Sequence, residues 1–151
     1  MIFQVLIVDD EPHVVESISA LLEKQCPYEL ELHAAYRAQQ AIEIMKQGRI
    51  DLLLTDIQMP GMDGLALIRE VHSLWPDCTT VILSAYSHFE YAYEAMNCRV
   101  AGYILKTEEE SDILKRLNAI LAQLEADLNH REWRAMGAQP TDALRQSLLM
   151  K

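Results

Sequence analysis

The sequence is short of basic residues, and this shortage excludes one class of protein. It has 13 lysines and arginines against 23 acidic residues, which gives a formal net charge of −10. Nucleic-acid binding depends on clustered Lys and Arg that contact phosphates, so the chain is not expected to bind nucleic acid by itself. The acidic balance suits a divalent cation site, because hard cations take oxygen ligands. It suits a plain solvated surface equally well.

Cysteine and long apolar runs are also scarce. Cys26, Cys78 and Cys98 are odd in number and widely spaced, with no Cys-x-x-Cys pair. Neither a disulfide framework nor a zinc site is predicted, and buried thiols in a reducing compartment are expected. No apolar run approaches the roughly 20 residues that span a membrane, and the N-terminus lacks a signal peptide. We therefore predict a cytoplasmic protein without membrane contact.

What is present is a regular alternation of two patterns. Half of the 151 residues are hydrophobic, enough for the core of one domain with a short appendage. Apolar runs at 3–8, 29–35, 51–55, 79–83 and 102–105 are predicted as strands. Apolar residues recur at helical spacing after each strand. Five such units predict an α/β fold with a doubly wound, five-stranded parallel sheet. Strand order 2-1-3-4-5 would make it a flavodoxin-like three-layer sandwich.

Local signals mark the ends of several helices. Pro12 suits the first turn of a helix, and Gly48 is a candidate C-cap. Thr107 with Glu110 three residues later has the pattern of a capping box, so the last helix is expected from about residue 108 to about 129. Asp63 is interpreted as a turn residue and helix cap that lies outside any site.

Polar side chains follow four of the five predicted strands. Asp9 and Asp10 follow the first strand, Asp56 the third, Ser84 the fourth and Lys106 the fifth. With the order 2-1-3-4-5, a crevice opens where the first and third strands diverge, so the three carboxylates should meet there. Three carboxylates repel each other unless a cation neutralises them. Mg²⁺ is the natural cation, because it accepts carboxylate, water and phosphate oxygens.

This set of residues suits phosphoryl transfer. A carboxylate can attack a phosphoryl group and form an aspartyl phosphate, and the reaction needs mainly positioning and charge neutralisation. Asp56 is the candidate nucleophile, Lys106 a second cation beside Mg²⁺, and Ser84 a donor to a phosphoryl oxygen. Each signal is weak alone, since adjacent acids also suit a helix N-terminus and a serine also caps a loop. The joint pattern carries the prediction.

Four motifs resemble those of the receiver domain of two-component response regulators. They are Leu6-Ile7-Val8-Asp9-Asp10-Glu11-Pro12, Asp56-Ile57-Gln58-Met59-Pro60-Gly61-Met62-Asp63-Gly64, Leu83-Ser84-Ala85-Tyr86-Ser87 and Gly102-Tyr103-Ile104-Leu105-Lys106. The resemblance covers residues 3 to about 128. It implies a phosphorylation-operated switch that receives its phosphoryl group from a sensor histidine kinase, and that hydrolyses its own aspartyl phosphate without being a conventional enzyme.

The same resemblance implies roles for individual residues. Asp56 would be the phosphoacceptor. Asp10 would bind Mg²⁺ directly, with Asp9 close by or acting through water, and the backbone carbonyl of Gln58 would complete the protein ligands. Lys106 would contact the phosphoryl group.

Ser84 and Tyr103 would form the switch pair, with Ser84 moving to the phosphoryl group and the Tyr103 ring turning inward behind it. One position departs from the family: the residue after Lys106 is usually a proline, often in a cis peptide bond, and here it is Thr107. A cis bond before a residue other than proline costs about 3–4 kcal/mol. Either the surroundings enforce that bond or the loop is rearranged.

The C-terminal part suggests a longer protein. Residues 84–92 resemble, at the level of a subgroup, receivers joined to AraC-type DNA-binding domains. We assign residues 1–129 to the receiver and 130–151 to a linker or the start of a downstream domain that would carry DNA binding and transcription regulation. Leucines in the last helix follow a heptad seam, at Leu114, Leu117, Leu121, Leu124 and Leu128. The first turns should cover the sheet, and a dimer or linker contact is expected beyond Leu121.

Parts of this pattern are compatible with other functions. The switch surface of the fourth helix, fifth strand and last helix would serve a homodimer, an attached effector, or, in a stand-alone receiver, a protein partner. A phosphohydrolase with an aspartyl nucleophile would carry an Asp-x-Asp pair, whereas Asp9 and Asp10 are adjacent. A flavodoxin-like module for FMN would need a phosphate-binding Ser/Thr/Gly loop, which the acids after the first strand disfavour.

Overall fold

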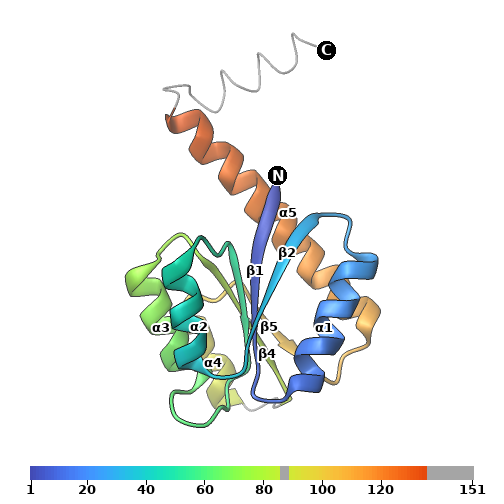
Figure 1. Ribbon diagram of the computed structural model, residues 1–151, viewed down its shortest axis with the longest axis vertical. Coiled ribbons are helices and arrows are strands. Elements are labelled where there is room, and N and C mark those ends of the chain that lie inside the picture. The colour runs from blue at the N-terminus through green and yellow to red at the C-terminus, as the bar shows by residue number, and fades with distance from the viewer. Residues whose placement is uncertain (86–88, 136–151) are drawn as a thin grey trace.

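A computed structural model describes residues 1–85 and 89–135, and in that part five strands alternate with five helices (Figure 1). The elements are β1 (Ile2–Val8), α1 (Pro12–Gln25), β2 (Glu29–Ala35), α2 (Ala38–Gln47), β3 (Leu52–Thr55), α3 (Gly64–Leu74), β4 (Thr79–Ser84), α4 (Phe89–Asn97), β5 (Gly102–Leu105) and α5 (Glu110–Ala135). Every strand lies within about one residue of its predicted range.

The strands form one parallel sheet in the order β2-β1-β3-β4-β5, which confirms the predicted topology. Its strands alternate with crossover helices, so all carboxyl ends meet at one edge. None of the helices in the described ranges is long and apolar enough to cross a bilayer.

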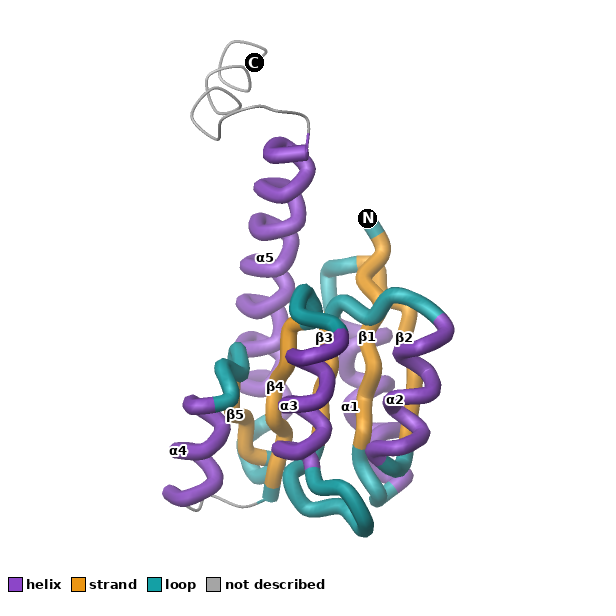
Figure 2. Tube along the Cα trace, turned by 90° about the vertical axis from the view of Figure 1, so that its left-hand side faces the viewer, coloured by secondary structure: helices purple, strands orange, loops and turns teal. Residues whose placement is uncertain are grey.

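Helices cover both faces of the sheet, as Figures 1 and 2 show, with α1 and α5 on one side and α2, α3 and α4 on the other. Successive strand residues point to opposite faces. In β1, Phe3, Val5 and Ile7 pack towards α1 and α5, and Leu6 and Val8 pack towards α2 and α3. All five are at most 1% exposed. The near-continuous apolar strands follow from this double burial.

The long helix α5 differs from the prediction at both ends. It begins at Glu110 and continues to Ala135, six residues beyond the predicted limit at 129. Thr107 lies in a turn before the helix, so the predicted capping box of Thr107 and Glu110 does not form. The carbonyl of Glu109 instead accepts from the backbone N–H groups of Asp112 and Ile113, at 2.9 and 3.0 Å.

The leucine seam of α5 packs against its own domain. Leu121 and Leu124 are 0% and 2% exposed and belong to the core between α5, α1 and the sheet, and the half-buried Leu128 packs on the same cluster. The expected dimer or linker contact through the seam beyond Leu121 is therefore wrong for these leucines. Figure 2 shows why the helix can use them: α5 lies along the sheet before its last turns extend past it.

The predictions for one end each of α1, α2 and α3 are confirmed. Pro12 is the first residue of α1, and Gly48 is the C-cap of α2. The side chain of Asp63 accepts from the backbone N–H of Ala66 at 2.8 Å and so caps α3.

The three cysteines are free thiols, with Cys78 and Cys98 buried and Cys26 half-buried. Burial raises the pKa of Cys78 to about 12, helped by the nearby charge of Asp51.

Candidate functional site

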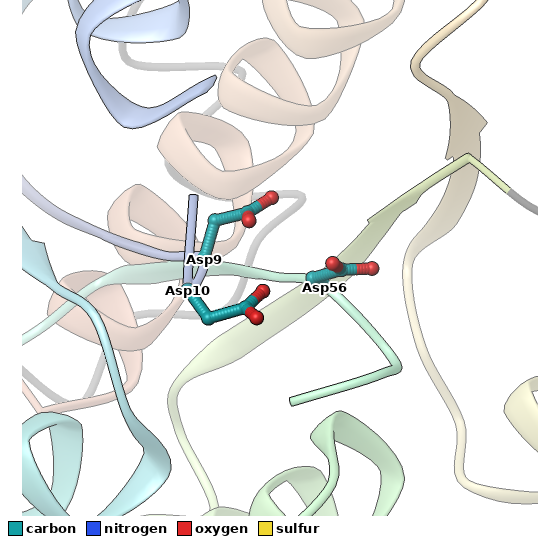
Figure 3. Close-up of side chains that lie close together, drawn as sticks. All are labelled: Asp9, Asp10 and Asp56. Carbon is teal, nitrogen blue, oxygen red and sulfur yellow. The ribbon is translucent and has the colours of Figure 1, made fainter. Parts of the chain in front are cut away.

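Three carboxylates meet at the carboxyl edge of the sheet (Figure 3). Asp9 and Asp10 follow β1, and Asp56 follows the neighbouring strand β3. One oxygen of each lies within 4.8 Å of the others. Asp9 and Asp56 are 2% and 6% exposed, whereas Asp10 is exposed to solvent. The structure thus brings together the acids that sequence reasoning placed at the switch point.

Backbone groups fix two of these side chains. Asp9 Oδ1 accepts from the N–H of Glu11 at 2.9 Å, and Asp56 Oδ1 accepts from the N–H of Ile57 at 2.8 Å. The N–H of Asp56 donates to the carbonyl of Val8 at 3.0 Å, which continues the pairing of β1 with β3. Each buried carboxylate therefore keeps its second oxygen for other partners.

Lys106, just after β5, supplies that partner. Its Nζ lies 2.6 Å from Asp9 Oδ2 and 3.1 Å from Asp56 Oδ2. Burial alone would lower the pKa of Lys106, but the hydrogen bond to Asp9 and the charge of Asp56 outweigh it, so the pKa is raised. The ammonium therefore stays charged and bridges two carboxylates from different strands.

The pKa of Asp56 is subject to opposing influences. Burial is the largest influence and raises its pKa above the ordinary value, and the charge of Asp9 adds to that rise. The opposing charge of Lys106 and the N–H of Ile57 favour the carboxylate and offset only part of the effect. One ammonium thus faces three acids, and the site attracts further positive charge.

The loop after Asp56 turns tightly because Gly64 has no side chain. The N–H of Gly64 donates to the carbonyl of Ile57 at 2.7 Å, and a Cβ at Gly64 would overlap the backbone carbonyl oxygen of Asp56. Only glycine permits this approach. Asp63, one residue earlier, caps α3 and is exposed, as predicted.

The other predicted residues lie around this cluster. Ser84 is fully buried at the end of β4, and its carbonyl accepts from the N–H of Lys106 at 2.8 Å. Tyr103 is half-buried in β5 and packs with the apolar cluster between the sheet, α3 and α4. Gln58 is exposed on the loop after β3. Of the predicted motif at 83–87 and the subgroup segment at 84–92, residues 86–88 lie outside the described ranges, as do residues 136–151 of the predicted linker.

Glu108 and Arg116, two residues near Lys106, were not predicted from the sequence. Glu108 accepts from the backbone N–H of Leu105 at 2.7 Å, and Arg116 pairs with Glu108 at 2.8 Å and donates to the carbonyl of Tyr103 at 2.7 Å. The capping-box pattern drew attention to Glu110 instead. The signal that could have found them is an acid close after Lys106 with an arginine two helical turns further on.

Every peptide bond in the described ranges is trans, including the bond between Lys106 and Thr107.

Comparisons with known proteins agree with this arrangement. Residues 5–118 match the response regulator receiver domain. The chain is 32% identical over 130 residues to the uncharacterized transcriptional regulatory protein YesN of Bacillus subtilis, covering 86% of this chain and 35% of that protein. It is 30% identical over 122 residues to the transcriptional regulatory protein HptR of Staphylococcus aureus, covering 81% and 46%.

A solved structure supports the same conclusion. The CheY-like response regulator receiver domain protein of Methanospirillum hungatei has a TM-score of 0.74 at 27% identity, over 84% of this chain and 99% of that one. The chain spans between a third and a half of the length of YesN and HptR. With a receiver match over most of its length and relatives that are transcriptional regulators, this chain belongs to the response regulator receiver domain family.

Proposed function

We propose that Asp56 accepts a phosphoryl group from the phosphohistidine of a sensor histidine kinase, in a reaction that requires Mg²⁺. The observation that carries this proposal is the environment of the Asp56 carboxylate. It is buried at a strand end, has two further carboxylates within 4.8 Å, and has the Lys106 ammonium at 3.1 Å. The excess of carboxylates over ammonium groups suits the binding of a cation. The Lys106 ammonium suits the binding of phosphate oxygens.

The residues present fit Mg²⁺. Three carboxylates are hard oxygen donors, and Mg²⁺ is held in proteins by one or two carboxylates together with water and phosphate oxygens. The exposed Asp10 and the buried Asp56 are the direct ligands in this proposal, with the backbone carbonyl of Gln58 as the third. Asp9 lies close by or acts through water in this proposal, because Lys106 holds its Oδ2 at 2.6 Å, closer than the 3.1 Å between Lys106 and Asp56. When bound, Mg²⁺ neutralises carboxylate charge and draws negative charge from phosphoryl oxygens.

The transfer itself needs one nucleophilic oxygen. An oxygen of Asp56 attacks phosphorus, the O–P bond forms, and the N–P bond to the kinase histidine breaks, with the released imidazole nitrogen taking up a proton. The N–H of Ile57 holds the other Asp56 oxygen and orients the carboxylate. From its position between Asp9 and Asp56, the Lys106 ammonium stabilises the negative charge that develops on the phosphoryl oxygens.

The switch proposal uses residues on the neighbouring strands. The hydroxyl of Ser84 moves to a phosphoryl oxygen, and the half-buried ring of Tyr103 moves further inward behind it. These changes alter the surface of α4, β5 and α5, which serves a homodimer or an attached effector. The state lapses when water attacks phosphorus, the P–O bond to Asp56 breaks, and inorganic phosphate leaves. The chain is thus a switch that resets itself and not an enzyme with an external substrate.

The wider proposal concerns what the switch controls. YesN and HptR are named transcriptional regulators, and the chain spans less than half of either. We infer that residues 1–129 are the receiver, that residues 130–151 lead to a downstream domain, and that DNA binding belongs to that domain. The net charge of −10 over the 151 residues supports this division, because it disfavours binding to the phosphate backbone of DNA.

Labelling with a small phosphodonor such as acetyl phosphate tests the proposal. The wild-type protein should gain one phosphoryl group only when Mg²⁺ is present, and Asp56→Asn should gain none. Asp63→Asn is the matched control, because Asp63 is exposed on the same loop and asparagine also caps helices well. Full labelling of Asp56→Asn would overturn the assignment.

A further inference from the structure

The turn that carries Lys106 is closed from both directions by Glu108. The N–H of Glu108 donates to the carbonyl of Leu105 at 3.1 Å, and the N–H of Leu105 donates to Glu108 Oε2 at 2.7 Å. Lys106 and Thr107 are therefore the two central residues of a turn that is tied by the backbone and by one side chain. The hydrogen bond from Leu105 is also the largest reason that the pKa of Glu108 is lowered.

Arg116 extends this closure to the helix. Its Nη1 lies 2.9 and 2.8 Å from Glu108 Oε1 and Oε2, and its Nη2 donates to the carbonyl of Tyr103 at 2.7 Å. The guanidinium thus joins α5, the turn and β5 in one hydrogen-bonded unit. A planar fork of donors is suited to holding two acceptors in a fixed geometry.

The two backbone groups involved belong to the outer edge of the sheet. β5 is an edge strand, and the N–H of Leu105 and the carbonyl of Tyr103 are two residues apart, so both face away from β4. An edge strand leaves such groups without a strand partner. Here side chains of the same chain satisfy them, and the position of β5 becomes tied to that of α5.

Lys106 lies between two anchors. On its inner side its N–H donates to the carbonyl of Ser84 at 2.8 Å, which continues the pairing of β4 with β5. On its outer side the turn is closed by Glu108. The residue between them, Thr107, is exposed and has no ring to restrict its backbone. The direction in which the Lys106 side chain leaves the sheet thus depends on the closure by Glu108.

We propose that Glu108 and Arg116 are positioning residues that hold the Lys106 ammonium between Asp9 and Asp56; this inference rests on the proposed function for its effect on phosphorylation. The side chains of Glu108 and Arg116 are 25% and 43% exposed, so their ion pair is largely a surface pair and contributes little to stability. Its effect is on the position of the Lys106 ammonium, because small displacements of a reacting group slow a reaction strongly.

The test compares Glu108→Ala, Glu108→Gln and Arg116→Ala with the wild-type receiver. Glu109→Ala is the matched control, since Glu109 is the next residue and its side chain is exposed. One measurement is the rate of labelling by acetyl phosphate at saturating Mg²⁺, with Mg²⁺ affinity determined separately by calorimetry. The other is the ¹H–¹⁵N signal of the Lys106 ammonium in Mg²⁺-free protein, assigned by its loss in Lys106→Arg. Melting by circular dichroism establishes that each variant folds.

We expect Glu108→Ala to label about tenfold more slowly than wild type while its Mg²⁺ affinity stays within about twofold, because no metal ligand is changed. Its ammonium signal should broaden as exchange with water increases. Glu108→Gln keeps an acceptor for Leu105 and should recover most of the rate. Arg116→Ala should give a smaller loss, and it supplies the answer if Glu108→Ala does not fold.

The two readouts separate this inference from the proposed function. If the wild-type protein takes up no phosphoryl group, the proposed function fails and the ammonium signal alone decides about Glu108. If wild type labels and Glu108→Ala matches Glu109→Ala in rate and signal, the positioning role is overturned. A slower rate with an unchanged ammonium signal would also overturn it, because the loss would then arise elsewhere.

Discussion

The ammonium of Lys106 lies 3.1 Å from a carboxylate oxygen of Asp56, fifty residues earlier in the chain. The contact exists because β3 and β5 flank β4 in one parallel sheet and both end at the same edge. The same ammonium lies 2.6 Å from Asp9. It is therefore an internal counter-ion for two buried acids.

Replacing Lys106 by methionine should expose the dependence of the site on positive charge. Lys106→Met leaves two buried carboxylates without their cation, and we expect a loss of about 2 kcal/mol in the free energy of unfolding in Mg²⁺-free buffer. Mg²⁺ should stabilise this variant more than it stabilises wild type. Urea denaturation with and without Mg²⁺ measures both effects. Lys46→Met, at an exposed ion pair, is the control, and equal responses of the two variants would contradict the account.

A second substitution tests the tight turn after Asp56. Gly64→Ala places a methyl group onto the backbone carbonyl of Asp56, so either the turn moves or the fold is lost. We expect a loss of at least about 3 kcal/mol, the range of a strong steric conflict in a core. Gly48→Ala is the control, because nothing lies within 4 Å of its Cβ position. Similar melting temperatures for the two variants would show that the loop is not held as described.

A third prediction concerns the leucines of α5. Leu121→Ala and Leu124→Ala remove side chains that are 0% and 2% exposed, and each should cost about 3 kcal/mol of unfolding free energy. Gln123→Ala, on the exposed side of the helix, should change it by less than about 0.5 kcal/mol. Chemical denaturation at two protein concentrations decides the question. A loss that appears only at the higher concentration would mean that the seam belongs to a dimer.

The same helix shows where sequence reasoning succeeds and where it stops. The strands and the meeting of Asp9 with Asp56 could be predicted, because buried strands are short apolar runs and parallel strands bring their carboxyl ends together. The start of α5 could not. The capping pattern of Thr107 and Glu110 is local. The start of the helix instead depends on contacts that Glu108 makes with Leu105 and with the helix itself.

The leucine seam failed for a related reason. A heptad spacing places side chains on one helical face but does not say what covers that face. Here the sheet and α1 cover it as far as Leu128. Asp51 is another contact without a sequence signal: it is buried, accepts from the N–H of Gln4 at 2.8 Å and pairs with Arg49 at 3.1 Å. Such pairs depend on which strands become neighbours.

The fourth prediction is a pH dependence from Glu108. Its pKa is lowered in the folded protein, first by the N–H of Leu105 and then by Arg116, relative to an ordinary value of 4.5. A lowered folded-state pKa adds stability above the ordinary pKa, and this stability is lost as the pH falls through the folded-state pKa. The stability difference between wild type and Glu108→Gln should therefore be largest above about pH 4.5 and shrink below it. A difference that stays constant over this range would contradict the contact.

The site of phosphorylation tests the central claim most directly. Wild-type protein labelled with acetyl phosphate and Mg²⁺ can be reduced with borohydride, which converts an aspartyl phosphate to homoserine, and then digested and mapped by mass spectrometry. The account predicts homoserine at position 56 and unmodified aspartates at positions 9 and 10. Modification of another residue, or none in protein that has taken up phosphate, would contradict the assignment of Asp56 as the phosphoacceptor.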